Sequence, residues 1–253
     1  MNPQTTIDSA RAKLIPVLEI FGPTVQGEGM VIGQKTMFVR TAGCDYRCSW
    51  CDSAFTWDGS AKDQIQLLTP EAIWEELQRL GGDRFSHVTL SGGNPALLPQ
   101  LGELVQLLKE KGIAAAVETQ GSRWQDWLTD VHEVTLSPKP PSSGMETNWE
   151  KLSEIIDKLS ARPAPYAYSL KIVIFNEEDL NYAKKVHGLY PSAPLYLQVG
   201  NPDVQRMDKG QHASELLSSY EALIEQVVAA PELNRVRVLP QLHTLVWGNK
   251  RGV

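Results

Sequence analysis

Short apolar segments that alternate with amphipathic ones are the feature that most limits the folds open to this chain of 253 residues. The predicted strands are Thr36–Arg40, His87–Leu90, Ile113–Thr119, Glu133–Ser137, Ser169–Phe175, Leu195–Val199 and Val236–Leu239. The predicted helices cover residues 70–80, 96–111, 149–160, 177–189 and 213–229. Strands that alternate with helices in this way indicate parallel βαβ units with right-handed crossovers.

The number of strands limits the architecture further. We expect about six core strands, which are too few for a closed eight-stranded barrel, so the candidates are an open, partial β/α barrel and a doubly wound sheet. No linker with a change in composition divides the chain. We therefore expect a tail over residues 1–14 and one α/β domain over residues 15–253. A strand is expected from Pro16, a glycine-rich turn over residues 22–29, and a loop over residues 52–68.

All three cysteines of the chain, Cys44, Cys48 and Cys51, fall within eight residues. Three thiols cannot form a closed set of disulfides, and they cannot supply four cysteine ligands to a zinc ion or an iron–sulfur cluster. If they hold one metal centre together, one coordination position stays open. An open position favours a catalytic centre over a structural one.

Two kinds of metal centre are compatible with three cysteines. One is a [4Fe-4S] cluster held at three of its irons, and the Cys-x3-Cys-x2-Cys spacing resembles that of the radical S-adenosylmethionine (SAM) enzymes. Their motif also places an aromatic residue before the last cysteine, which is Trp50 here. Zinc on three cysteines and one histidine is disfavoured, because none of the five histidines lies at zinc-ligand spacing from the cysteines. Three unliganded thiols in one loop would be prone to oxidation.

Charge and hydropathy exclude several classes of partner. The net charge of −6 argues against a nucleic-acid surface, which needs a basic excess. No apolar run approaches the ~18 residues that span a bilayer, and Met1–Lys13 lacks the apolar core of a signal peptide. The lack of a disulfide framework agrees with a reducing cytoplasm. We therefore expect a cytoplasmic protein with neither a nucleic-acid nor a membrane partner.

Polar and glycine-rich segments follow the predicted strands, where ligands gather in parallel α/β folds. Besides the cysteine loop, these segments are Ser91–Pro95, Glu118–Gly121, Ser137–Pro141 and Gln198–Asn201. A Gly-Gly pair after one strand is often only a turn. Because these segments accompany a metal motif, together they predict a ligand site at one end of the sheet.

From Leu18 to the C-terminus the chain resembles the 7-carboxy-7-deazaguanine synthases, which are radical SAM enzymes of the 7-deazapurine (queuosine) pathway. The segments that carry the resemblance are Phe21–Gly29, Phe38–Cys44 and Cys51–Ser53. The resemblance implies an incomplete β6/α3 barrel, usually in a homodimer. It also implies a lyase that converts 6-carboxy-5,6,7,8-tetrahydropterin to 7-carboxy-7-deazaguanine with loss of ammonia.

The resemblance also implies which residues act. The three cysteines would hold a [4Fe-4S] cluster whose fourth iron binds SAM, and no catalytic side chain is expected beyond the cluster and cofactor. A low-potential donor such as a flavodoxin or ferredoxin would reduce the cluster. The implied substrate-binding residues are Val25, Gln26, Gly27, Arg40 and Ser91. The predicted SAM-binding residues are Gly93, Glu118, Ser137, Pro138, Lys139, Gln198, Val199, Gly200 and Asn201. Ser53 would bind Mg²⁺, a hard cation that prefers oxygen ligands.

One position departs from the pattern of the radical SAM enzymes. They often have a glutamate in a Gly-Gly-Glu-Pro turn, where this chain has Asn94. If the SAM amine needs that carboxylate, Glu118 would have to replace it. Arg40 and Glu118 are also open to a simpler interpretation as ion-pair partners. The C-terminal residues 239–253 are neither simple nor strongly charged, so we expect them to pack near the site.

Two other functions stay open at this point. A radical activase, which forms a glycyl radical on a partner protein, shares the cysteine spacing. The glutamine–glycine segment before the first strand of the predicted barrel favours a small substrate instead. A non-catalytic iron–sulfur electron carrier is the third possibility, although a carrier usually has a fully ligated cluster.

Overall fold

The computed structural model describes residues 14–253. The tail expected over residues 1–14 therefore lies outside the described residues, except for Leu14. The described chain forms a nine-stranded sheet in the order β3-β1-β2-β4-β5-β6-β7-β8-β9. The strands are β1 Ile15–Val25, β2 Lys35–Thr41, β3 Gln66–Leu68, β4 His87–Gly92, β5 Ala114–Thr119, β6 Glu133–Leu136, β7 Ala167–Ile174, β8 Leu195–Val199 and β9 Arg237–Leu239.

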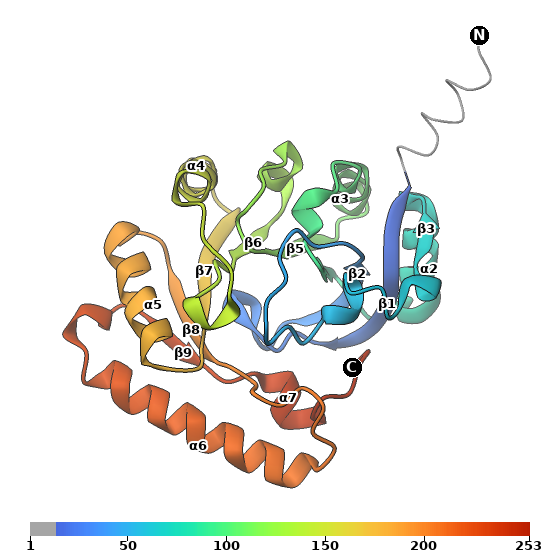
Figure 1. Cartoon of the computed structure of the whole chain (residues 1–253). Helices are drawn as coiled ribbons and strands as arrows, with labels where there is room; N and C mark the ends of the chain where they lie inside the picture. Colours follow the sequence, from blue (N-terminus) through green and yellow to red (C-terminus); the bar gives the residue numbers. More distant parts are fainter. Residues whose placement is uncertain (1–13) are drawn as a thin grey trace.

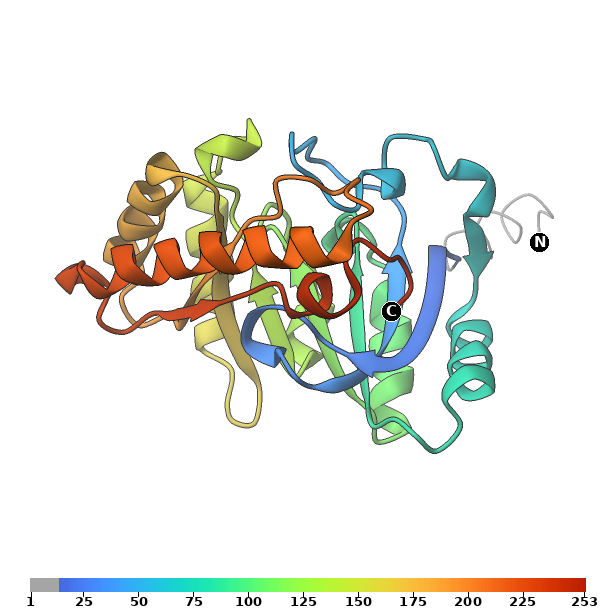
Figure 2. The same cartoon turned by 90° about the horizontal axis from the view of Figure 1, so that it is seen from below.

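Helices cover the outer face of this curved sheet, as Figure 1 shows for α3, α4 and α5. The helices are α2 Pro70–Gly81, α3 Leu101–Glu110, α4 Trp149–Ser160, α5 Glu177–Leu189, α6 Lys209–Val228 and α7 Leu242–Trp247. Seen from below, the short helix α7 lies between the long helix α6 and the first two strands (Figure 2). None of the helices in the described part of the chain has the length and hydropathy to cross a membrane.

The expected partial barrel is confirmed. Strands β2 and β4 to β9 pair in parallel, whereas β1 runs antiparallel to both β2 and β3. The parallel part corresponds to the predicted strands, and it exceeds the expected count of about six because the three-residue edge strand β9 pairs with β8 as well. In the described chain β3 and β9 form the two edges of the sheet, so the barrel stays open.

The two faces of the sheet differ in chemistry because side chains alternate along a strand. In β7, Leu170, Ile172 and Ile174 belong to the hydrophobic core that the helices cover. On the alternate positions of the same strand, Ser169 and Lys171 are also buried but lie outside that apolar cluster. The outer face thus supplies the core, and the concave face keeps polar groups for a ligand.

The turn expected from residue 22 is wrong, because β1 continues to Val25. Gly22 takes a φ of 115°, which only glycine adopts readily, and the pairing of β1 with β2 shifts between Phe21 and Thr24. Because of this irregularity, β1 continues across Gly22 and Pro23 instead of ending there. The strand therefore carries residues 25–27 to the concave side of the barrel.

Three further boundaries differ from those expected. Helix α3 begins at Leu101 rather than residue 96, after a 3₁₀ turn over Pro95–Leu97. Helix α6 begins at Lys209 rather than residue 213, because the Asp208 side chain accepts a hydrogen bond from the Gln211 backbone N–H at 3.0 Å. The loop expected over residues 52–68 contains the short edge strand β3.

Candidate active site

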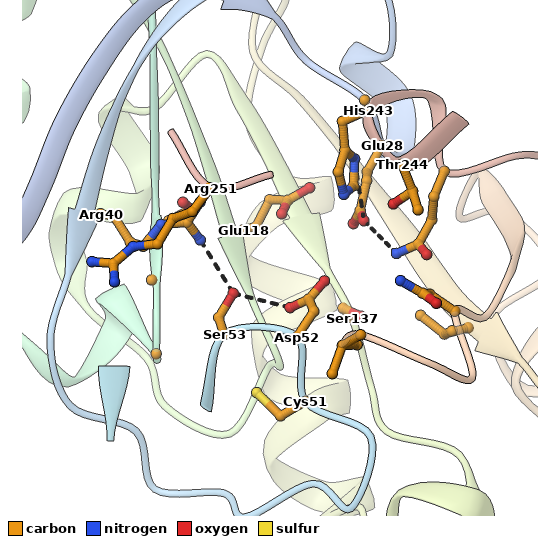
Figure 3. A pocket seen from close by; sticks show the side chains of 18 of the residues that line it. Glu28, Arg40, Cys51, Asp52, Ser53, Glu118, Ser137, His243, Thr244 and Arg251 are labelled. Atoms are coloured by element: carbon orange, nitrogen blue, oxygen red, sulfur yellow. Dashed lines mark hydrogen bonds and ion pairs between the residues drawn. The ribbon is translucent and has the colours of Figure 1, made fainter. Parts of the chain in front are cut away.

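A cavity of about 280 Å³ opens on the concave side, where the parallel strands end. Strands β1, β2, β4, β5 and β7, the cysteine loop and the C-terminal segment all contribute to its wall (Figure 3). The predicted site residues that line the cavity are Val25, Gln26, Gly27, Arg40, Cys44, Cys48, Cys51, Ser53, Ser91, Gly93, Glu118, Ser137, Lys139 and Asn201. The fold thus brings most of the implied cofactor and substrate residues to one place.

Four predicted SAM-binding residues, Pro138, Gln198, Val199 and Gly200, do not line this cavity. Val199 and Gly200 line a second cavity of about 220 Å³. Gln198 is fully buried, and neither of its amide atoms has a hydrogen-bond partner among the described residues. Their role toward SAM stays a prediction.

The cysteine sulfurs receive hydrogen-bond donors from the surrounding wall. Cys44 Sγ accepts from the Tyr46 backbone N–H at 3.4 Å and from Gln120 Nε2 at 3.6 Å, and Cys51 Sγ accepts from Trp57 Nε1 at 3.5 Å. Donors of this kind stabilise the negative charge of metal-bound thiolates. Burial raises the pKa of the Cys48 thiol to about 11, so binding of a metal centre there releases a proton. This donor set fits an iron–sulfur cluster.

Gly93 allows the turn after β4 to lie directly against the cysteine loop. A Cβ atom at this position would be 2.1 Å from the Gly43 carbonyl oxygen and 2.9 Å from Cys44 Cβ. The next residue, Asn94, donates its backbone N–H to the same Gly43 carbonyl at 2.8 Å. Any larger residue at position 93 would therefore displace the first cysteine.

The asparagine that departs from the radical SAM pattern has a structural role here. Asn94 Oδ1 accepts from Thr119 Oγ1 at 2.7 Å, and Asn94 Nδ2 donates to Asp45 Oδ1 at 2.9 Å and Ser122 Oγ at 3.1 Å. Asp45 also accepts from Gln120 Nε2 at 2.5 Å. Asn94 is buried and does not line the cavity. It ties the cysteine loop to the ends of β4 and β5.

A largely buried set of three charges consists of Lys171, Glu28 and Glu118, whose side chains are 6%, 13% and 21% exposed. Lys171 Nζ forms an ion pair with Glu28 and lies 3.4 Å from Glu118 Oε1. Burial alone would raise the pKa of the Glu28 carboxyl, but Lys171 and His243 hold that pKa well below its ordinary value. Burial would lower the pKa of Lys171, whereas Glu118 and Glu28 raise it. Because the pKa of Glu28 is lowered and that of Lys171 is raised, the two side chains form an ionised pair at neutral pH.

Glu118 thus takes the ion-pair role that the sequence left open. It lies beside Lys171 and still lines the cavity. Its replacement of a SAM-binding glutamate stays a prediction.

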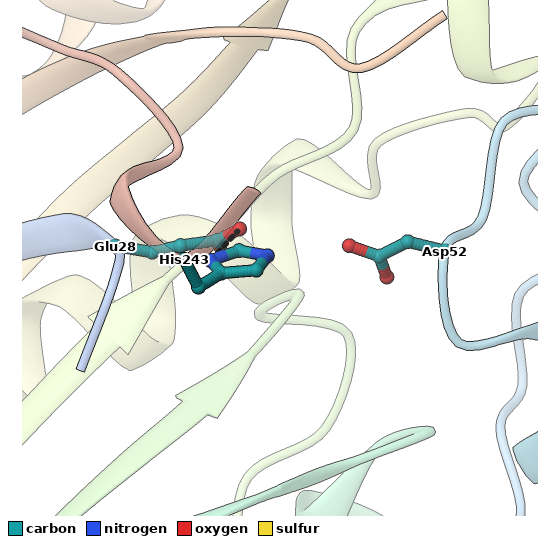
Figure 4. Close-up of side chains that lie close together, drawn as sticks. All are labelled: Glu28, Asp52 and His243. Atoms are coloured by element: carbon teal, nitrogen blue, oxygen red, sulfur yellow. Dashed lines mark ion pairs between the residues drawn. The ribbon is translucent and has the colours of Figure 1, made fainter. Parts of the chain in front are cut away.

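Glu28 also contacts the C-terminal part of the chain. Its Oε1 accepts from Gln241 Nε2 at 2.8 Å and lies 3.9 Å from His243 Nδ1. Ligand atoms of Glu28, Asp52 and His243 lie within 4.8 Å of one another (Figure 4). Four residues of the site were not predicted from the sequence: Glu28, Asp52, Lys171 and His243. Lys171 carried a signal, since a charge inside an apolar strand needs a buried partner.

Arg40 has the ion-pair role considered for it, and its role toward the substrate stays a prediction. Its Nε donates to Glu19 Oε1 at 2.6 Å, so it is an ion-pair partner, and its guanidinium also lines the cavity. Arg40 Nη1 donates to Ser53 Oγ at 3.2 Å, and Ser53 Oγ donates to Asp52 Oδ1 at 2.9 Å. These contacts connect the residue after the last cysteine to the β1–β2 pair.

Two of the implied substrate residues offer unused polar atoms. Gln26 accepts from the Gly27 backbone N–H at 2.6 Å through Oε1, while its buried Nε2 has no partner among the described residues. Ser91 Oγ is likewise buried without a partner in the described chain. Buried polar atoms cost free energy when they stay unpaired, so their position on the cavity wall fits a polar ligand.

The C-terminal segment packs at the site as expected. Residues 248–253 line the cavity, and the Leu242 backbone N–H donates to the Gly27 carbonyl at 3.1 Å. A Cβ atom on Gly27 would lie 2.5 Å from His243 Nδ1, so only glycine allows α7 to pack this closely. Asn249 Nδ2 donates to the carbonyls of Asp203 at 2.9 Å and Arg206 at 3.1 Å. The segment is thus held from both sides.

Comparisons with known proteins agree with this geometry. Residues 38–173 match the model of the radical SAM superfamily. The 7-carboxy-7-deazaguanine synthase of Bacillus subtilis is 64% identical over 242 residues, covering 96% of this chain and 100% of the relative. That of Bacillus cereus is 60% identical over 239 residues, covering 94% and 99%.

Among solved structures, the fold is similar to that of QueE from Escherichia coli. The TM-score is 0.66 at 23% sequence identity, over 91% of this chain and 95% of the other. The chain therefore belongs to the radical SAM superfamily and, within it, to the 7-carboxy-7-deazaguanine synthases.

Proposed function

We propose that the chain converts 6-carboxy-5,6,7,8-tetrahydropterin to 7-carboxy-7-deazaguanine with loss of ammonia. The observation that carries this proposal is the cavity itself. It joins three cysteines, two of which have hydrogen-bond donors on their sulfurs, to an ionised Glu28–Lys171 pair and to Arg40. A protein docking surface, which an activase needs, would not require an enclosed set of charges of this kind.

The family implies a [4Fe-4S] cluster and SAM, and the cysteine wall fits the cluster. Cys44, Cys48 and Cys51 would hold it, with Gln120 and Trp57 donating to the sulfurs. When bound and reduced, this pair of cofactors supplies a 5′-deoxyadenosyl radical that removes hydrogen from the substrate. Ser137 and Lys139 line the same cavity, where Lys139 Nζ donates to Ser137 Oγ at 3.1 Å. We assign both to the SAM side of the cavity.

The charged residues suit the edge of a pterin. The amino and ring N–H groups of the pterin can donate hydrogen bonds to the carboxylates of Glu28 and Glu118. The pterin carbonyl can accept a hydrogen bond from Lys171. The substrate carboxylate suits the Arg40 guanidinium, which binds such groups through paired hydrogen bonds. Val25, Gln26, Gly27 and Ser91 complete the substrate wall. The role of these residues is to fix one orientation of the ring, so that a single hydrogen faces the radical.

Aromatic side chains limit the access of water. Phe21 and Phe38 stack with ring centroids 4.8 Å apart, and both line the cavity. Phe55, Trp57 and Phe175 add further apolar surface to the wall. A radical intermediate needs such a wall, because water and stray hydrogen donors would otherwise quench it.

Magnesium is the third component of the proposal. Ser53 Oγ and the Asp52 carboxylate are adjacent oxygen atoms on the cavity wall, and oxygen ligands suit Mg²⁺. In this position the ion would orient and polarise the substrate. We further propose a homodimer and a flavodoxin or ferredoxin as the electron donor.

The test is an anaerobic assay of the reconstituted protein. With SAM and a reductant, formation of 5′-deoxyadenosine distinguishes an enzyme from an electron carrier. Addition of 6-carboxy-5,6,7,8-tetrahydropterin should then yield 7-carboxy-7-deazaguanine, identified by mass spectrometry. Cofactor cleavage that never depends on the pterin would contradict the proposal and favour an activase.

A further inference from the structure

Glu19 lies between two guanidinium groups that come from distant parts of the chain. Its Oε1 accepts from Arg40 Nε at 2.6 Å, and its Oε2 accepts from Arg251 Nε at 2.9 Å. Glu19 and Arg40 face each other across the antiparallel β1–β2 pair. Arg251 belongs to the C-terminal segment, and Figure 3 shows both arginines on the same wall of the cavity.

An aromatic ring restricts both guanidinium groups. The Phe55 ring centroid lies 5.7 Å from Arg40 Cζ and 3.9 Å from Arg251 Cζ. The side chains of Glu19 and Arg40 are each 18% exposed, and that of Arg251 is 35% exposed. Cation–π contacts at partly buried sites hold the guanidinium planes in place. The two cations are therefore built into the wall rather than free in solvent.

The remaining hydrogen bonds leave each arginine with an unused nitrogen. Arg40 Nη1 donates to Ser53, and Arg251 Nη2 donates to Gln64 Oε1 at 3.2 Å. No hydrogen bond within residues 14–253 uses Arg40 Nη2 or Arg251 Nη1. Since one carboxylate serves two guanidinium groups, this wall keeps an excess positive charge beside the cavity.

We propose that Arg251 is a second binding residue for the substrate carboxylate and that Glu19 is the positioning residue for both arginines. Two guanidinium groups on one shared carboxylate form a two-arginine clamp that selects pterins bearing a carboxylate. Charge-assisted hydrogen bonds from both sides bind that group more tightly than Arg40 alone. This inference rests on the proposed function, because it assumes a carboxylated pterin.

The clamp also connects substrate binding to the C-terminal segment. Arg251 follows Asn249, which is tied to the backbone of residues 203 and 206. A substrate carboxylate on Arg251 would stabilise residues 248–253 against the cavity. A pterin without the carboxylate would leave that segment unchanged.

The experiment compares two ligands that differ only in the carboxylate, 6-carboxypterin and pterin. Each is titrated calorimetrically into reconstituted, SAM-loaded protein. The wild-type protein should prefer 6-carboxypterin, and Arg251→Gln should weaken its binding about tenfold, the lower end expected for a lost hydrogen bond to a charged group. Pterin binding should not change. Arg251→Lys should recover little, because an ammonium does not reproduce the guanidinium geometry.

Glu19→Gln tests the positioning role. It should weaken binding of 6-carboxypterin but not of pterin, and it should raise hydrogen exchange in residues 248–253 while the barrel strands keep their protection. Arg235→Gln is the matched control, since Arg235 is exposed and outside the cavity. It removes the same charge and should leave both affinities unchanged.

Two results would overturn the inference, and they differ from each other. If wild-type protein prefers 6-carboxypterin and Arg251→Gln keeps that preference, the clamp is wrong and the proposed function stands. If wild-type protein binds neither ligand, the proposed function falls and the clamp falls with it.

Discussion

The cavity has two chemically different walls, the cysteine loop and the buried charge set. The loop provides its three sulfur ligands within eight residues of sequence. The charge set joins Glu28 to Lys171, whose positions differ by 143 residues, and adds Glu118 from another strand. The first wall is a local motif that the barrel only has to present. The second exists only after the strands have assembled.

The two walls also differ in what stabilises them. The cysteine loop is held by hydrogen bonds around Asp45 and Asn94, and these bonds are partly or fully exposed to solvent. The charge set keeps ionised groups away from water, where each ion offsets the desolvation cost of the other. Damage to the loop should therefore abolish chemistry with little effect on folding, and damage to the charge set should affect both.

The largest effect is expected from Cys48→Ala. Because each cysteine would hold a different iron of the proposed cluster, this change should remove the intact cluster and all SAM cleavage. Iron and sulfide analysis and 5′-deoxyadenosine formation measure the two losses. Ser49→Ala in the same loop is the control and should keep both. An intact cluster with normal turnover in the Cys48 variant would show that the loop is not the metal site.

Lys171→Met tests how much the charge set contributes to stability. Removing one partner of a buried ion pair typically costs about 3–5 kcal/mol, so the free energy of unfolding should fall by roughly that amount. Urea denaturation measures the loss. An exposed control, Lys109→Met, removes a partner of Asp130 and should cost under about 1 kcal/mol. Equal losses in the two variants would show that the charge set is not buried in solution.

The pH dependence sharpens this comparison. The pKa of Glu28 is below its ordinary value of 4.5, so its contribution to stability is complete above that pH and declines as the pH falls. The pKa of Lys171 is above its ordinary 10.5, so its contribution is complete below that pH and declines as the pH rises. The stability difference between wild type and Lys171→Met should therefore be largest between about pH 5 and 10. A difference that is constant down to pH 3 would contradict this assignment.

The same contrast explains what could be predicted from the sequence. The cysteine motif and the alternation of strands and helices are local patterns, and they predicted a metal site on an open α/β sheet. Most of the other lining residues were predicted from the family resemblance. Lys171 carried a local signal as a charge inside an apolar strand, but its pairing with Glu28 and the approach of His243 to Glu28 arise only across the barrel. Asn94 looked like a missing carboxylate because its partners, Asp45 and Thr119, are distant in sequence.

Arg40 lies between the two walls, and its variants are expected to have an intermediate effect. Arg40→Ala should weaken binding of 6-carboxypterin by ~1.5–3 kcal/mol, the usual range for a hydrogen bond to a charged group. Arg40→Lys should recover little of it. Iron content should stay unchanged in both. Calorimetric titration into SAM-loaded protein decides the point, and unaltered affinity with a lower melting temperature would leave Arg40 as an ion-pair partner of Glu19 alone.

The smallest effect is expected from Ser53→Ala. If the Ser53 hydroxyl binds Mg²⁺, its loss should weaken the dependence of turnover on magnesium, while the neighbouring cysteines keep their iron. Activity measured over a series of magnesium concentrations gives the shift. Full wild-type activity under stringent chelation of magnesium would remove the metal from the proposal.

The close packing of Gly27 against His243 has a consequence for redesign of the cavity. The glycine has no side chain to remove, and any residue with a Cβ atom would push α7 outward together with the cavity residues Gln241 and Thr244. Positions 27 and 243 therefore cannot be varied independently. An enzyme engineered for a bulkier pterin would have to gain its space at position 243, while position 27 stays glycine because its Cβ would lie 2.8 Å from the backbone N of residue 243.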